Sequence, residues 1–117
     1  MNEFDVSAVK RSGCQVVTLR GDLDGDTAPL LDDALDQLSR REKVIVDLSR
    51  LDVLTSAGLQ SLLRERRFGW PALACPDGRI GRILEIVQAH RVVPIYRDLD
   101  GALAALADSG FRRQRSS

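Results

Sequence analysis

Cysteine is scarce in this chain of 117 residues, and histidine is scarcer still. Cys14 and Cys75 are too few for a disulfide framework and have no companion metal ligands at a useful spacing. We therefore interpret both as small buried hydrophobic residues. His90 is the single histidine, and no cysteine or acid pattern marks it as the base of a catalytic triad, so we place it in a loop or at a helix end.

Long apolar runs are also missing. No run approaches the ~18 residues of a transmembrane helix, and the N-terminus has neither the basic start nor the apolar stretch of a signal peptide. The net charge is zero, because 17 basic residues balance 17 acidic ones, so no overall field draws the protein to nucleic acid or to an anionic membrane. We expect a cytoplasmic protein that contacts neither and carries no cofactor or metal.

The length is that of one domain, since a typical domain holds about 100–150 residues. Hydrophobic residues make up 44% of the chain, which is enough for one core and excludes intrinsic disorder for the body of the chain. We expect a single domain over 1–117, with a folded core over about 4–108 and a flexible tail over 109–117.

Strand and helix patterns alternate along the chain. Val6–Val9 and Cys14–Leu19 are β-rich runs around a polar stretch with a glycine, which predicts an opening hairpin. Val44–Leu48 is a nearly continuous β-branched run, as expected of a central strand covered on both faces. A linker is expected over 49–55. Further strands are predicted over 71–75 and 92–96, and amphipathic helices are predicted to begin near Thr27, Ser56, Arg79 and Asp98.

This alternation predicts an α/β domain. Its sheet should be mixed, with four to five strands and Val44–Leu48 near the middle, and the initial hairpin should add an antiparallel edge to parallel βαβ units. The third helix should turn five apolar side chains inward, namely Ile80, Ile83, Leu84, Ile86 and Val87.

Three closely spaced acids, Asp22, Asp24 and Asp26, invite a metal interpretation. As a calcium loop they fail, because the sixth position is Thr27 where the sharp turn needs glycine, and the twelfth is Asp33 instead of a bidentate glutamate. The simplest interpretation is a solvated turn that favours a helix N-terminus through the helix dipole.

An enzymatic interpretation of the same acids remains as an alternative. Asp22 and Asp24 follow a strand in an Asp-x-Asp-Gly pattern, which suits the nucleophilic aspartate of a small phosphatase or phosphoacceptor protein. However, Lys10 and Lys43 are the only lysines, so no late lysine can steady a phosphoaspartate. The same absence argues against a receiver domain phosphorylated at Asp47.

The hydroxyl at the start of the second helix has two possible roles. A serine at such a boundary can accept a backbone N–H as an N-cap, which is sufficient to explain Ser56. It can also accept a phosphoryl group, which adds about −1.5 to −2 charge beside free N–H groups and changes what a partner surface meets.

Several motifs, in order, resemble those of one known family. Gly21–Asp24 resembles a Gly-acid-apolar-Asp turn before the first helix, and Thr55–Leu59 resembles an Asp-Ser-Ser/Ala-Gly-Leu phosphorylation motif with its phosphoacceptor at Ser56. Three later segments, Cys75-Pro76, Ile83–Glu85 and Val93–Tyr96 before Leu99 and Ala102, fit the C-terminal half. From about Val6 to Ala107, the chain resembles a STAS domain of the anti-sigma-factor antagonist family.

The resemblance implies a STAS-like fold and a regulatory role in bacterial transcription. A member binds an anti-sigma factor of the serine-kinase type when its serine, here Ser56, is unmodified, and releases it when phosphorylated. The kinase supplies the ATP, a separate phosphatase restores the serine, and the chain itself is no enzyme. The implied partner-binding residues are Asp22, Asp24, Thr55, Ser56, Ala57 and Gly58.

Three departures from the family pattern qualify this picture. Thr55 stands where many members have aspartate, so a STAS interaction module without a phosphorylation switch stays open as an alternative. The segment after Gly58 is about one helical turn short, and its late residues Phe68–Trp70 would suit partner contact if exposed. Gln88 replaces a frequent glycine, which predicts that the third helix ends without a left-handed cap.

Overall fold

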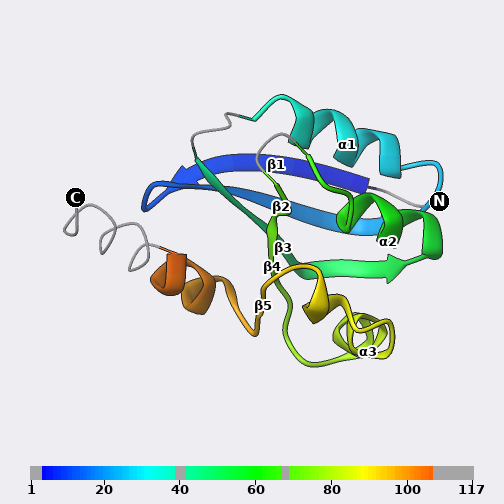
Figure 1. The fold of residues 1–117 in the computed structure, drawn as a ribbon. Helices are drawn as coiled ribbons and strands as arrows, with labels where there is room; N and C mark the ends of the chain where they lie inside the picture. Colours follow the sequence, from blue (N-terminus) through cyan, green and yellow to red (C-terminus); the bar gives the residue numbers. More distant parts are fainter. Residues whose placement is uncertain (1–3, 39–41, 67–68, 107–117) are drawn as a thin grey trace.

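The computed structural model describes residues 4–38, 42–66 and 69–106, which form a mixed sheet with helices on both faces (Figure 1). The strands are β1 (Phe4–Arg11), β2 (Cys14–Leu23), β3 (Lys43–Leu54), β4 (Ala72–Ala74) and β5 (Ile95–Tyr96). They lie in the order β1-β2-β3-β4-β5. β1 is antiparallel to β2, and all later pairs are parallel, which confirms the predicted α/β architecture.

A two-residue turn closes the predicted hairpin between β1 and β2. Its residues, Ser12 and Gly13, have φ angles of 52° and 78°. Two successive positive φ angles are what a type I′ turn needs to match the twist of the flanking strands. Pairing is then unbroken from Arg11 opposite Cys14 to Phe4 opposite Gly21.

The central strand is longer than predicted. β3 continues to Leu54, so the linker expected over 49–55 is wrong for all but its last residue. Leu51 pairs with Gly21 of β2 and is buried, and Leu54 pairs with Leu23 and is buried too. Register shifts along this stretch break the strict alternation of polar and apolar residues, which is the signal on which a strand prediction depends.

The helices begin where they were predicted. They are α1 (Ala28–Asp36), α2 (Ser56–Leu62), α3 (Arg79–Ile86), a 3₁₀ turn η1 (Ala89–Arg91) and a helix over residues 99–106. The tail expected over 109–117 lies outside the described residues. No described helix has the length and hydropathy needed to cross a bilayer.

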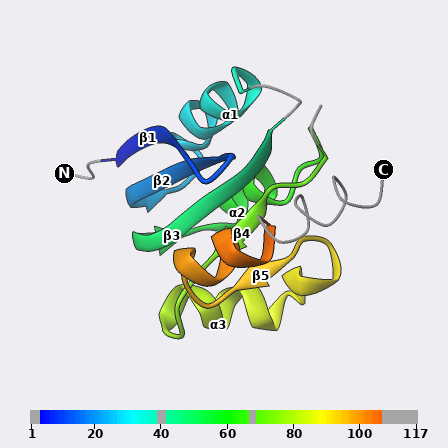
Figure 2. The same cartoon turned by 90° about the vertical axis from the view of Figure 1, so that its left-hand side faces the viewer.

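Helices cover the two faces of the sheet unequally. α1, α2 and α3 pack on one face, where Leu35, Leu62 and Leu84 join Val46 of β3 in the larger core. Helix 99–106 packs on the other face, where its Ala102 and Leu103 meet Ile45 and strand residues on either side (Figure 2). This double covering explains the continuous apolar run at the start of β3.

The cysteines and the histidine lie where the sequence suggested. Cys14 and Cys75 are buried free thiols, and burial raises the pKa of each above its ordinary value. Such thiols are unreactive. His90 is exposed in the short turn η1.

The end of α3 corrects two expectations. Ile86 and Val87 do not turn inward: they are 71% and 45% exposed, because Ile86 lies on the opposite side of the helix from the buried Leu84 and the helix stops before Val87. Gln88 then adopts the left-handed conformation (φ 58°, ψ 43°) that the absence of glycine had argued against. This reversal lets Ala89 and Val93 bury themselves instead. The final strand shortens as a result, from the predicted 92–96 to Ile95–Tyr96.

We predict that Gln88→Gly stabilises the protein by about 0.5–1 kcal/mol, because glycine adopts the left-handed conformation without the steric cost that glutamine bears. Val87→Gly is the matched control, since Val87 has a φ of −85° and gains nothing from glycine. It should lower stability. Urea denaturation of the two variants measures both changes, and a loss of stability in Gln88→Gly would contradict the account of this helix end.

Candidate functional site

The start of α2 is fastened to the end of β2 through one carbonyl group. Leu23 O accepts a hydrogen bond from Thr55 N at 3.1 Å, and the Thr55 hydroxyl lies 3.5 Å from the same oxygen. The Thr55 hydroxyl also accepts from Gly58 N at 3.4 Å, which makes Thr55 the N-cap of α2. Ser56 is therefore the first helical residue and is exposed, so the capping role considered for it belongs to its neighbour.

Gly58 allows α2 to approach β2 this closely. A Cβ atom at this position would lie 2.5 Å from Leu23 O and 2.8 Å from Leu23 Cγ, both closer than any real contact. Gly25, in the turn after β2, packs on the same helix end: a Cβ there would lie 3.7 Å from Ala57 Cβ, an ordinary contact distance. The two motifs singled out in the sequence thus meet in space.

The acidic turn before α1 is held by its own side chains. Asp24 Oδ1 accepts hydrogen bonds from Asp26 N and Thr27 N, each at 3.0 Å. The Thr27 hydroxyl donates to Asp22 O at 2.8 Å and accepts from Asp24 N at 2.9 Å. The Asp24 carboxylate therefore has a structural task as a turn former, as the solvated-turn interpretation expects.

The candidate site combines this turn with the start of α2. Asp22 and Asp24 are half-buried, Thr55, Ser56 and Ala57 are exposed, and Gly58 is buried. Leu23 pairs with Leu54, so the segments that follow β2 and β3 emerge side by side at the carboxyl ends of these parallel strands. The exposed hydroxyl of Ser56 therefore lies on the same edge of the sheet as the turn that carries Asp22 and Asp24. Within the three described segments, no group of three or more cysteine, histidine or acidic side chains could hold a metal ion.

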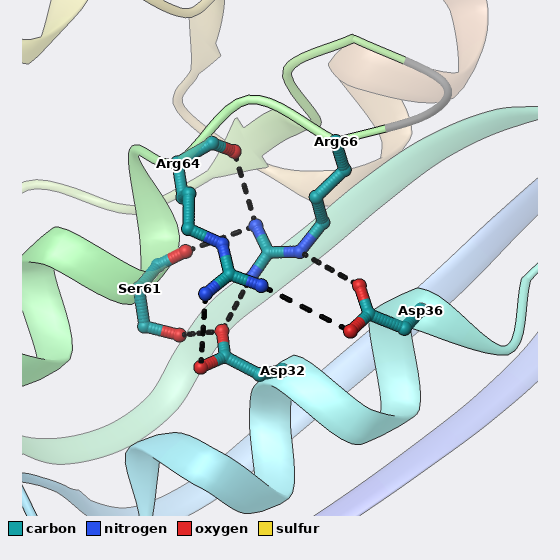
Figure 3. Close-up of polar contacts among 5 residues, drawn as sticks. All are labelled: Asp32, Asp36, Ser61, Arg64 and Arg66. Carbon is teal, nitrogen blue, oxygen red and sulfur yellow. Dashed lines mark hydrogen bonds and ion pairs between the residues drawn. The ribbon is translucent and has the colours of Figure 1, made fainter.

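A buried arginine, which the sequence analysis missed, fixes the other end of α2 (Figure 3). The Arg66 side chain is only 2% exposed, and its guanidinium forms an ion pair with Asp32 of α1. Its Nη1 donates to the carbonyl oxygens of Ser61 (3.0 Å) and Arg64 (3.1 Å). Its Nε lies 3.7 Å from Asp36 and makes no hydrogen bond to any residue that the structure describes. The Arg66 side chain thereby joins α1 to the end of α2.

Charge and burial oppose each other at this contact, which we call the Arg66 clasp. Burial lowers the pKa of Arg66 below its ordinary value, while the nearby Asp32 carboxylate raises it. An arginine stays protonated at neutral pH despite such a shift. Asp32 also accepts a hydrogen bond from the Ser61 hydroxyl, and Arg64 lies 3.7 Å from Asp32 at the exposed rim. Arg64 and Arg66, which follow α2, thus both interact with Asp32 of α1.

The aromatic segment after the clasp is described only in part. Trp70 is 43% exposed, and its indole N–H donates to Leu63 O at 3.0 Å. Arg66 and Gly69 exchange two backbone hydrogen bonds of 2.8 Å. Phe68, the other aromatic residue expected to suit partner contact, lies outside the described residues.

Comparisons with known proteins place this geometry in context. A family model described as "Mlab, STAS domain" matches residues 6–68. A crystal structure of an anti-sigma factor antagonist from Mycobacterium paratuberculosis superposes with a TM-score of 0.78 at 24% identity, covering 88% of this chain and 93% of that one. An anti-sigma-factor antagonist (STAS) domain protein from Planctomyces limnophilus gives a TM-score of 0.66 at 20% identity, with coverages of 86% and 95%.

A third solved structure, the anti-sigma factor antagonist SpoIIAA in its unphosphorylated form, gives a TM-score of 0.66 at 18% identity, covering 89% of this chain and 96% of that one. These similarities show that the chain has the same fold as the three solved structures. No curated protein sequence matches the chain.

We predict that Gly58→Ala destabilises the protein by about 1–3 kcal/mol, as overpacking does, although alanine favours helices. Gly25→Ala is the matched control, because its Cβ would make only an ordinary contact and should change stability by less than about 0.5 kcal/mol. Denaturant midpoints compare the two variants. Equal midpoints would show that α2 does not press on β2 as described.

Removing the clasp should cost more than removing its exposed neighbour. We expect Arg66→Ala to destabilise by about 2–3 kcal/mol, less than the loss of one partner from a fully buried pair, because Asp32 keeps some contact with water. Arg64→Ala, which removes a half-exposed arginine from the same cluster, should cost less than about 1 kcal/mol. Guanidinium denaturation distinguishes them, and a larger loss for Arg64→Ala would refute this assignment.

Proposed function

Because the chain belongs to the STAS domain family, we propose that it is an anti-sigma-factor antagonist that switches partners through Ser56. With Ser56 unmodified it binds an anti-sigma factor of the serine-kinase type, and with Ser56 phosphorylated it releases that factor. The exposed hydroxyl of Ser56 at the first position of α2, beside the turn that carries Asp22 and Asp24, is the observation on which the proposal rests. The protein would act in the bacterial cytoplasm to regulate transcription, without direct contact with nucleic acid or membrane.

The hydrogen bonds of this region favour Ser56 over Thr55 as the phosphoacceptor. The Thr55 hydroxyl caps α2 and faces Leu23 O, so a phosphoryl group on it would remove the cap. Ser56 is exposed and is not the N-cap, so its hydroxyl faces no such conflict. A kinase active site can therefore reach Ser56 without disturbing the helix start.

The chain would be substrate and binder, and the catalytic groups would belong to its partners. In the kinase, Ser56 Oγ attacks the γ-phosphorus of bound ATP, the bond from that phosphorus to its bridging oxygen breaks, and ADP leaves while the hydroxyl proton passes to a base of the kinase. A separate phosphatase would transfer the phosphoryl group to water and restore the serine. The turn-forming role of the Asp24 carboxylate counts against the alternative of a phosphatase built on Asp22 and Asp24.

Charge explains why phosphorylation would release the partner. The kinase must cover Ser56 to modify it, so the unmodified protein binds through the surface formed by Asp22, Asp24 and Thr55–Gly58. A phosphate of about −1.5 to −2 charge there stands beside carboxylates in a region that a docked partner desolvates, and unfavourable contacts of this kind cost several kcal/mol. An anion at a helix N-terminus is favourable by about 0.3–1 kcal/mol, so the fold itself is kept.

A second candidate is a STAS interaction module that lacks the switch. Its support is the neutral Thr55, which places no charge beside Ser56 for a kinase to recognise, although the cap is intact. In this case the same surface would bind one partner constitutively. The variants below separate the two candidates.

We expect Ser56→Asp to weaken binding to the anti-sigma factor at least about tenfold, since each ~1.4 kcal/mol of lost contact is a factor of ten. Ser56→Ala should bind like the unmodified protein but resist release by kinase and ATP. The partner is first isolated from the native cytoplasm on immobilised Ser56→Ala protein, and its affinity for each variant is then measured by titration calorimetry.

Ser49→Asp is the matched control, because it adds the same charge at an exposed serine of β3 outside the candidate site. It should leave the affinity unchanged, and all three variants should keep the melting temperature of the unsubstituted protein. Equal affinities for the Ser56→Asp and unsubstituted proteins would favour the module without a switch.

A further inference from the structure

The outer strand of the sheet has an open edge. Among the described residues β1 is paired only with β2, and β2 is paired on its other side with β3. α1 packs against β1, and Phe4 and Val6 are the β1 residues that are partly buried against the core cluster to which α1 contributes. The second half of β1, Ala8–Arg11, is exposed, and Val9 presents 54% of its surface to solvent.

The hairpin geometry determines which backbone groups point to this edge. Arg11 and Cys14 flank a two-residue turn, so they form a hydrogen-bonded pair, and every second residue of β1 before them does the same. The N–H and C=O groups of the alternate residues, Val6, Ala8 and Lys10, therefore point away from β2. They form a regular row of donors and acceptors.

The edge lacks two common obstacles to strand addition. β1 contains no proline, and its pairing with β2 has no bulge. One face of β1 carries two exposed residues of opposite charge. Asp5 lies near the start of the strand and Arg11 lies at its end, six residues later. Lys10 points to the other face, where it forms an ion pair with Glu42 at 3.2 Å.

We propose that this edge binds a second copy of the chain, strand to strand and antiparallel, around a two-fold axis at Ala8. Because opposite residues in an antiparallel pair must both point their backbone groups at the partner strand, Ala8 can face Ala8 of the second copy. In that register Asp5 faces Arg11 of the second copy, and Arg11 faces its Asp5. The symmetric contact thus makes two ion pairs.

Apolar burial adds to this charge complementarity. In the same register Val9 faces Ser7 of the second copy and lies diagonal to its Val9, on the same face as the two ion pairs. The Val9 side chains of the two copies then pack together, with one Asp5–Arg11 ion pair on either side of them. The α1 helices cover opposite ends of the paired strands, so they do not collide across the axis. No residue of the candidate site lies on β1, and dimerisation is therefore independent of partner binding.

A charge exchange tests the proposal on the full chain. Analytical ultracentrifugation should show a concentration-dependent monomer–dimer equilibrium. Arg11→Asp and Asp5→Arg, each of which opposes like charges twice, should each raise the dissociation constant about tenfold or more. The double variant, Asp5→Arg with Arg11→Asp, should return it to within about threefold of the unsubstituted value. Arg82→Asp, at an exposed arginine of α3, is the matched control and should leave it unchanged.

Disulfide formation tests the register. Residues opposite one another in a hydrogen-bonded antiparallel pair have Cα atoms about 5.5 Å apart, within the range for a disulfide. Ala8→Cys should therefore cross-link under mild oxidation about tenfold faster than Val9→Cys, while the buried Cys14 and Cys75 leave the unsubstituted chain unlinked. A protein that stays monomeric up to about 1 mM, charge reversals that leave the dissociation constant unchanged, or faster linking through position 9 would overturn the proposal.

Discussion

The carbonyl oxygen of Leu23 is the contact on which the candidate site depends. It accepts the backbone N–H of Thr55, lies beside the Thr55 hydroxyl, and is approached so closely by α2 that only glycine fits at position 58. Asp22 and Asp24 of the acidic turn flank Leu23 in the chain. A single peptide group therefore positions both halves of the site, and it leaves Ser56 as the first side chain beyond the contact that projects into solvent.

The α2 helix, which this contact holds, would not be stable as an isolated peptide. α2 has only seven residues, far below the length at which an isolated helix is stable in water. It is fixed at its start through Leu23 and at its end through the Arg66 clasp, whose guanidinium satisfies carbonyl oxygens that a short helix leaves open. α1 contributes Asp32 to the clasp and stands directly after the acidic turn, so the turn and α2 are linked twice.

The sequence predicted the features that depend on neighbouring residues and missed those that depend on contacts between distant parts of the chain. Val44–Leu48 and the helix starts carry local patterns, and the carboxyl ends of parallel strands predict that Asp22 and Asp24 meet the segment after Thr55. The rest of β3 was missed because register shifts against β2 disturb its alternation, and a pairing partner is not visible in one strand. The Arg66 clasp joins residues more than thirty positions apart, and nothing local separates a buried arginine from an exposed one. Whether Thr55 or Ser56 caps α2 depends on a single backbone ψ angle.

The capping role of position 55 can be filled by residues of different charge. Threonine and aspartate both serve as N-caps, because each offers an oxygen to the N–H groups of the first turn. The charge beside the exposed serine can consequently change by one substitution while the helix start and the glycine contact persist. Position 55 therefore sets the charge beside Ser56 independently of the close packing that holds α2 against β2.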